Sequence, residues 1–139
     1  SPRTLVISIL LPRKKVEPIK KYFNFFNKII IKALHNLGVK NLYQKGISDI
    51  SIRDHKIAGS AVYQNKERIF YHAVLNINES GDILEKYIKH PSREPDYRKN
   101  RNHQNFVTSL QKEGYSLRFG VIKKALTKEF SREQLFQQN

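Results

Sequence analysis

The stretch SDISIRDHKIAGSAVYQNKERIFYHAVLNIN, residues 48–78, decides the fold class of this chain. Its β-branched and aromatic residues gather in segments at Asp49–Arg53, Lys56–Tyr63 and Arg68–Asn76. The connections between them, DH and QNKE, are short and polar enough for hairpins. We therefore predict a meander of antiparallel strands.

A glycine inside the second of these strands raises the question of what lies against it. Gly59 stands in the small-residue run Ala58–Ala61, shortly after Lys56. Glycine in a strand interior costs entropy and packs nothing, so it often marks the close approach of a ligand or another backbone. A lysine that points into a cleft can hold a phosphate or a developing oxyanion. The other interpretation is an exposed hairpin lysine beside a bulge, and the spacing alone favours it.

The flanking segments place this meander in an α+β fold. Thr4–Leu11 reads as a buried strand that Pro12 ends. Apolar residues at helical spacing predict a long amphipathic helix from Pro18 to Leu37, and Gly38 ends it. We expect a mostly antiparallel sheet covered by helices on one side.

The rest of the chain is predicted to be helical with polar connections. Ser80 can cap a helix that runs through Ile88, and Phe106–Leu110 suits a short helix. Apolar spacing predicts another helix over Phe119–Phe130. Ser131 and Gln134 then have the spacing of a capping box, which would open a final turn.

The composition favours an anionic partner and excludes cysteine chemistry. The 26 Lys and Arg residues against 12 Asp and Glu give a formal net charge of +14. The chain has no cysteine, which excludes disulfides, thiolate metal sites and cysteine nucleophiles within it. The apolar stretch Thr4–Pro12 is too short to span a membrane and lacks the cleavage region of a signal peptide. We expect a soluble cytoplasmic protein and no membrane partner.

Asp49 and the histidines are further candidates for chemistry. Asp49 is the sole carboxylate of KGISDISI, and as a strand-start residue it can simply cap a turn. Beside a phosphate-holding lysine it can instead bind Mg²⁺. His72 lies within a strand, where a histidine usually has a structural role. The remaining loop histidines show no metal-like spacing: His55, His90 and His103.

A basic connector, His90–Gln104, precedes Phe106 and contains Tyr97, Arg98 and Arg101. Basic residues interleaved with aromatic ones can bind single-stranded nucleic acid, but a solvated basic face is the interpretation that we prefer. The chain lacks the G-x-x-x-x-G-K-[ST], G-x-S-x-G and G-x-G-x-x-G motifs. Three common nucleotide or hydrolase signals are therefore missing.

Taken in order, SDISI, KIAGSA, FYHAVLNIN and SREPDYRKNRNHQNFVTSL resemble the lipoate–protein ligase A family, part of the biotin/lipoate protein ligase superfamily. The resemblance covers roughly Leu5 to Leu110. It implies that residues 1–110 are the core part of a catalytic domain and that residues 111–139 are a C-terminal helical extension. The family's glycine-rich loop should precede Ser1, so we expect the chain to be part of a larger polypeptide. Biotin ligases share this fold and a similar lysine.

This resemblance implies an enzyme that activates lipoate with ATP to lipoyl-AMP and transfers the lipoyl group to a lysine of an acceptor domain. Its cofactors would be ATP, lipoate and Mg²⁺. Lys56 would be the catalytic residue that holds the acyl carbonyl and α-phosphate oxygens, while Asp49 would position the phosphate or its Mg²⁺. The adenylate would lie against Gly59, Ser60, Ala61 and His72. Arg98 and Arg101 would contact the acceptor protein or a phosphate.

The implied partners are acidic lipoyl acceptor domains of 2-oxoacid dehydrogenase complexes, or the glycine-cleavage H protein. The sequence departs from the family in part: the family's His-Gly-Thr strand reads His72-Ala73-Val74, and Ser48 stands where the family has Asn. The alternatives are a lipoyl or octanoyl transferase or a biotin ligase of the same fold, and an inactive scaffold of the same family. A non-enzymatic, basic nucleic-acid-binding module also stays open.

Overall fold

The computed structural model describes residues 3–79, 96–101 and 106–133. Within these residues the strands are β1 (Thr4–Pro12), β2 (Leu42–Lys45), β3 (Asp49–Ile52), β4 (His55–Gln64) and β5 (Arg68–Asn76). The helices are α1 (Ile19–Asn36), the 3-10 helix η1 (Asp96–Arg98) and α4 (Phe119–Arg132). The predicted helix at Ser80–Ile88 lies outside the described residues.

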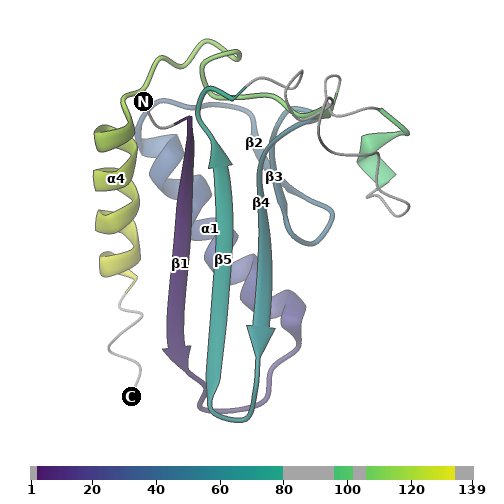
Figure 1. The fold of residues 1–139 in the computed structure, drawn as a ribbon, viewed down its shortest axis with the longest axis vertical. Coiled ribbons are helices and arrows are strands. Elements are labelled where there is room, and N and C mark those ends of the chain that lie inside the picture. Colours follow the sequence, from purple (N-terminus) through teal and green to yellow (C-terminus); the bar gives the residue numbers. More distant parts are fainter. Residues whose placement is uncertain (1–2, 80–95, 102–105, 134–139) are drawn as a thin grey trace.

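The strands form a 5-stranded sheet in the order β1-β5-β4-β3-β2, and every neighbouring pair is antiparallel. α1 crosses one face of this sheet, α4 packs alongside α1, and η1 lies beside one end of the meander (Figure 1). The predicted α+β class, with helices on one side of an antiparallel sheet, is confirmed. None of the helices in the described part of the chain is long and apolar enough to cross a membrane.

α1 forms because its apolar residues recur along one side, which faces the sheet. Phe26, Ile30 and Leu34 are almost fully buried there, and burying each such side chain contributes about 1.5–3 kcal/mol. Gly38 ends the helix with a φ of +94°, and the N–H groups of Gly38 and Val39 bond the carbonyls of His35 and Leu34. The bounds of α1 agree with the predicted helix to within one residue at each end.

α4 shares the core of the sheet and α1. Its side chains Ile122, Leu126 and Phe130 belong to the same buried cluster as Ile30 and Leu34. The predicted helix Phe119–Phe130 is confirmed, and residues that were assigned to a C-terminal extension thus complete the helical layer.

Two local features differ from the sequence-based predictions. β2 was not predicted, because LYQK is too short to show an alternation. The predicted helix at Phe106–Leu110 is wrong from Val107 onward, where the backbone instead forms a parallel bridge with Lys56. The reason is that the Val107 segment satisfies its backbone groups against β4 and not within a helical turn.

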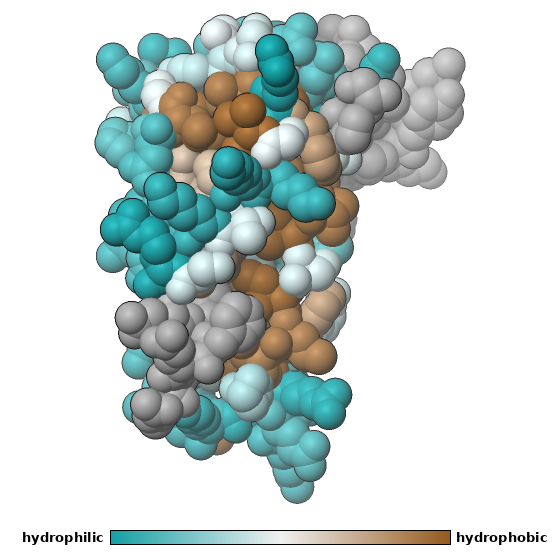
Figure 2. Space-filling view, turned by 90° about the vertical axis from the view of Figure 1, so that its left-hand side faces the viewer, coloured by the Kyte–Doolittle hydropathy of each residue, from teal (hydrophilic) through white to brown (hydrophobic). Residues whose placement is uncertain are grey.

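The sheet has one face toward α1 and a second face that we call the open face. Cross-strand partners share a face, so the pairs Gly59–Val74 and Ala61–His72 lie on the open face, opposite the buried Tyr71. Among the described residues, η1 lies against the Asp49 end of the open face. The β1 side of this face is exposed, where Val6 and Leu10 are 57% and 55% exposed. Seen from the side of α4 and β1, apolar side chains gather near the top and run down the right of the molecule, and hydrophilic side chains lie on the left at mid-height (Figure 2).

Candidate active site

A β-bulge brings Lys56 to the open face. Along β4 the core-facing residues alternate through Val62, Ser60 and Ala58, so a regular strand would turn Lys56 toward the core as well. The pairing with β3 shifts between Ile50 and Ser51, which places one additional residue, Ile57, on β4. Ile57 and Ala58 are both buried, and Lys56 consequently shares the face of Gly59. Re-aiming a side chain is a known use of bulges near functional sites.

Lys56 is paired there with a buried carboxylate. Its Nζ lies 3.2 Å from Asp49 Oδ1, and the Asp49 side chain is 8% exposed against 32% for Lys56. Asp49 opens β3 and stands directly opposite Gly59. The proximity of Asp49 and Lys56, which the family resemblance implies, is thus present in the structure.

Gly59 gives the lysine its space. A Cβ atom at this position would lie 3.0 Å from both Cε and Nζ of Lys56, and 3.7 Å from Asp49 Oδ1. A contact of 3.0 Å is tighter than side chains normally accept. The group that approaches the glycine closely is therefore the side chain of Lys56 itself, which lies flat along the strand.

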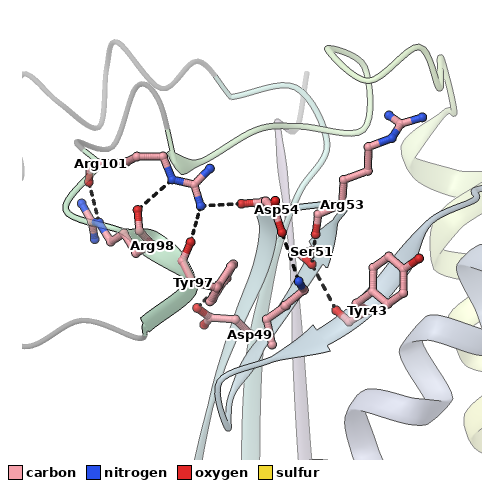
Figure 3. Close-up of polar contacts among 9 residues, drawn as sticks. Tyr43, Asp49, Ser51, Arg53, Asp54, Tyr97, Arg98 and Arg101 are labelled. Carbon is pink, nitrogen blue, oxygen red and sulfur yellow. Dashed lines mark hydrogen bonds and ion pairs between the residues drawn. The ribbon is translucent and has the colours of Figure 1, made fainter.

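Tyr97 of η1 is a site residue that sequence reasoning missed. Its hydroxyl donates a hydrogen bond of 2.9 Å to Asp49 Oδ2 (Figure 3). Lys56 contacts the other carboxylate oxygen, Oδ1. Burial raises the pKa of Tyr97 above its ordinary value, and the negative charge of Asp49 raises it further. The sequence contained one indication of this residue, an aromatic side chain within the basic connector. That indication did not predict which residue Tyr97 contacts.

Arg98 and Arg101 fix the segment that carries Tyr97. Each arginine donates from Nε to the backbone carbonyl of the other at 2.7 Å, and Arg101 also bonds the carbonyls of Tyr97 and Asp54 (Figure 3). Their guanidinium groups lie 4.8 Å and 5.3 Å from the ring centroid of Phe106. Arg98 is 3% exposed, so in this conformation its side chain packs inside the protein.

The segment after Phe106 borders the lysine on its backbone side. The N–H of Thr108 donates to the carbonyl of Lys56 at 2.8 Å, next to the parallel bridge between Lys56 and Val107. Lys56 is consequently held by β3 through its side chain and by residues 107–108 through its main chain.

The other predicted site residues divide between the two faces. Ala61 and His72 are direct partners on the open face, where His72 Nδ1 lies 3.1 Å from Ser8 Oγ and the ring stacks on Phe70. Ser60 lies on the opposite face, because its cross-strand partner is the buried Ala73. Its hydroxyl donates to the carbonyl of Ser48 at 2.8 Å. Four of the predicted site residues therefore lie on the open face: Lys56, Gly59, Ala61 and His72. Ser60 contributes only its main-chain atoms to this face.

A protein-built metal centre is absent from the described residues, which contain no cluster of three or more His, Asp or Glu side chains. Asp49 is the carboxylate next to Lys56, and both of its oxygens have partners. The arrangement presents one ammonium group on a flat strand, with one buried carboxylate beneath it. Such a site suits an anionic ligand that lies along the strand.

Comparisons with known proteins agree with this interpretation of the fold. The model of the lipoyl protein ligase A/B catalytic domain matches residues 1–131, and the chain belongs to that family. Lipoate–protein ligase 1 of Staphylococcus aureus (strain Mu50) is 36% identical over 67 residues, which are 48% of this chain and 20% of that protein.

Solved structures show the same fold. A bipartite lipoate protein ligase of Thermoplasma acidophilum, described with its E2 lipoyl domain, superposes with a TM-score of 0.77 at 20% identity, covering 94% of this chain and 51% of that one. A lipoate–protein ligase A bound with ATP gives a TM-score of 0.75 at 20% identity over 93% and 51%. The chain therefore spans about half the length of these structures.

Proposed function

We propose that this chain forms the lysine-bearing part of a lipoate–protein ligase, which activates lipoate with ATP to lipoyl-AMP and transfers the lipoyl group to a lysine of an acceptor domain. The observation that carries the proposal is the Lys56 ammonium group, held over Gly59 by the buried Asp49 in a chain of this family.

In the first half-reaction the lipoate carboxylate attacks the α-phosphorus of ATP, and the bond to pyrophosphate breaks. Negative charge grows on the α-phosphate oxygens in the transition state. A fixed cation beside those oxygens lowers the barrier, because its interaction strengthens as the charge grows. Lys56 is the residue to provide it, since Asp49 fixes the ammonium group before the substrate binds.

In the second half-reaction an acceptor amine attacks the acyl carbon of the adenylate. The carbonyl oxygen becomes an oxyanion, the carbon–oxygen bond to AMP breaks, and the amine loses a proton to solvent. One ammonium group between the α-phosphate and the acyl carbonyl can serve both half-reactions. This double use requires that the ammonium group of Lys56 has a defined position.

The open face provides the floor for the adenylate. The space above Gly59 holds the side chain of Lys56. The small side chain of Ala61 then lets a ligand approach the β4 backbone beside the ammonium group. His72 continues the same face on β5, beside Ser8. Ser60 supports the site from beneath by its hydrogen bonds to Ser48, the residue before Asp49.

Mg²⁺ fits this site only as an ion that the phosphates of ATP largely coordinate. Asp49 alone provides too few oxygen ligands for an all-protein site, whereas Mg²⁺ commonly uses one or two carboxylates together with substrate phosphates. Asp49 would be the residue to hold it, and the ion would neutralise charge on the triphosphate.

The partners follow from the charge and from the family. A chain with 26 basic and 12 acidic residues favours acidic acceptor domains through long-range attraction. The Thermoplasma relative is described together with an E2 lipoyl domain, which supports a lipoyl domain of a 2-oxoacid dehydrogenase complex as the acceptor. The glycine-cleavage H protein is the alternative acceptor, and a cytoplasmic location remains our prediction.

Calorimetric titration of a non-hydrolysable lipoyl-AMP analogue tests the proposal. We expect saturable binding by the protein and at least a tenfold loss of affinity in Lys56→Ala, since a charge-assisted contact is worth about 1.5–3 kcal/mol. Lys66→Ala in the exposed β4–β5 hairpin is the matched control and should bind like the wild type. Equal affinity in Lys56→Ala would refute the site assignment. Stronger competition by biotin or octanoate than by lipoate would show that the site prefers that acid to lipoate.

A further inference from the structure

We propose that Tyr97 is a positioning residue, which holds the carboxylate of Asp49 and through it the ammonium group of Lys56. The inference rests on the proposed function, because it assigns Tyr97 a part in the same site. It starts from a contact between segments 48 residues apart in the sequence, the hydrogen bond of 2.9 Å from the Tyr97 hydroxyl to Asp49 Oδ2.

The two oxygens of Asp49 have different partners, and this fixes the plane of the carboxylate. Oδ1 lies 3.2 Å from Lys56 Nζ, and Oδ2 accepts a hydrogen bond from the Tyr97 hydroxyl. With one partner alone, a carboxylate can turn about its side-chain bonds and carry the lysine with it. Because Asp49 is 8% exposed, solvent gives little compensation for a lost hydrogen bond, and the second partner therefore determines where the first one stays.

Tyr97 is itself held from several directions. Its ring packs against Phe106, with ring centroids 5.0 Å apart at an interplanar angle of 59°, and Lys45 Nζ lies 5.7 Å from its centroid. Its backbone carbonyl accepts a hydrogen bond from Arg101, whose guanidinium group also bonds the carbonyl of Asp54 at 2.8 Å. η1 is therefore attached to the β3–β4 hairpin, and the tyrosine hydroxyl has a defined position relative to Asp49.

The hydroxyl also keeps the proton that it must donate. Burial, followed by the negative charge of Asp49, raises the pKa of Tyr97 above its ordinary value. The groups that face Tyr97 from the neighbouring elements are Asp49, Lys45 and Arg101. The hydroxyl consequently stays a donor to the carboxylate throughout the neutral range.

The variant Tyr97→Phe keeps the ring and its contact with Phe106 and removes only the hydroxyl. If Tyr97 has a role in packing alone, this variant should leave kcat and KM unchanged. If Tyr97 positions the pair, this variant lowers kcat of ATP-dependent lipoyl-AMP formation about tenfold, because a displaced catalytic group costs rate at every turnover. The KM for ATP should stay within twofold. Tyr43→Phe, at an exposed position of β2, is the matched control and should leave both constants unchanged.

A double-mutant cycle with Asp49→Ala tests whether Tyr97 acts through Asp49. We expect the double variant to be no slower than Asp49→Ala alone, since the hydroxyl has nothing to hold without the carboxylate. Unchanged kcat in Tyr97→Phe, or effects that multiply in the double variant, would overturn the inference. If Asp49→Ala does not fold, the kinetics of Tyr97→Phe alone test the inference: kcat should fall while the KM for ATP stays within twofold.

A second readout separates this inference from the proposed function. The urea midpoints of the same four proteins should show less than additive shifts, which report the contact without any substrate. A wild type that forms no adenylate refutes the proposed function, and the urea cycle then still tests the contact. Additive midpoints would overturn the positioning role even in an active enzyme.

Discussion

The side chain of Lys56 occupies the volume that Gly59 leaves empty, with Cε and Nζ each 3.0 Å from the place of a Cβ atom. This relationship predicts that Gly59→Ala displaces the ammonium group from Asp49. Because the displaced atoms are the end of a flexible side chain, we expect a stability change within about 1 kcal/mol. Affinity for the lipoyl-AMP analogue should fall about tenfold, measured by calorimetry.

Gly120→Ala is the matched control for that substitution. A Cβ at Gly120, near the start of α4, meets nothing within 4 Å. Alanine is the better helix former, so this variant should be more stable by up to about 1 kcal/mol and should bind the analogue normally. Normal binding by Gly59→Ala would show that the position of Lys56 does not depend on the glycine.

Arg101 connects η1 to the rest of the site, and its removal should affect both stability and rate. Arg101→Ala deletes hydrogen bonds to the carbonyls of Arg98, Tyr97 and Asp54. We expect the free energy of unfolding to fall by about 1–3 kcal/mol in urea titrations, and adenylate formation to slow as Tyr97 loses its support. Arg118→Ala, at an exposed position before α4, should change neither. If Arg101→Ala forms the adenylate slowly but keeps the stability of the wild type, the arginine supports the position of Tyr97 and contributes nothing to the stability of the fold.

Glu129 joins the two helices of the outer layer without contacting the open face. Its carboxylate is 2% exposed, and it accepts a hydrogen bond of 3.0 Å from Asn36 Nδ2 and lies 3.8 Å from Lys32 Nζ. Glu129→Ala should lower the free energy of unfolding by about 1–3 kcal/mol. Lys32→Ala should cost less than about 1 kcal/mol, because Lys32 is half exposed. Thermal and urea unfolding measure both, and unchanged analogue binding would confirm that α4 stabilises the fold and not the site.

The raised pKa values of two tyrosines predict a loss of stability at high pH. Burial first, and then Asp49, raises the pKa of Tyr97, and burial raises that of Tyr71. Above about pH 10 the unfolded chain releases protons that the folded protein retains, so the free energy of unfolding falls as the pH rises, by up to about 1.4 kcal/mol per pH unit for each tyrosine. Below pH 9 both groups stay protonated in both states, and we expect no such dependence.

Urea titrations at pH 9 and pH 11 measure this effect. Tyr97→Phe should lose about half of the tyrosine-dependent slope, and the part due to Tyr71 should remain. An equal slope in the wild type and in Tyr97→Phe would mean that Tyr97 ionises alike in the folded and unfolded states.

The sequence predicted well those parts of the fold in which periodicity is strong and local. The apolar residues of α1 repeat over five helical turns, and the hairpins of the meander carry polar turn residues. β2 escaped prediction because its four residues give no period. The helix expected at Val107 gave way to a backbone bridge with Lys56, which no local preference encodes.

The arrangement of the candidate site residues could be predicted in part, for the same reason. Lys56, Asp49 and Gly59 lie within one hairpin, so the resemblance of adjacent segments was enough to bring them together. The bulge at Ile57, which turns Lys56 to the open face, depends on how β4 pairs with β3. Tyr97 escaped because its partner is 48 residues away and its neighbours in the sequence read as a solvated basic connector.

The hydrogen bond between Tyr97 and Asp49 also bears on the order of events in folding. α1 and the hairpins depend on contacts between near neighbours in the chain, whereas this contact must close a loop of 48 residues and is entropically costly. We therefore expect α1 and the β3–β5 meander to form before the side chain of Lys56 is fixed. In native-state hydrogen exchange the amides of residues 97–101 should open at a lower free energy than those of β4 and β5. A molecule can then possess its native hairpins and still lack the contact between Tyr97 and Asp49, which makes this contact a reporter of a late stage of folding.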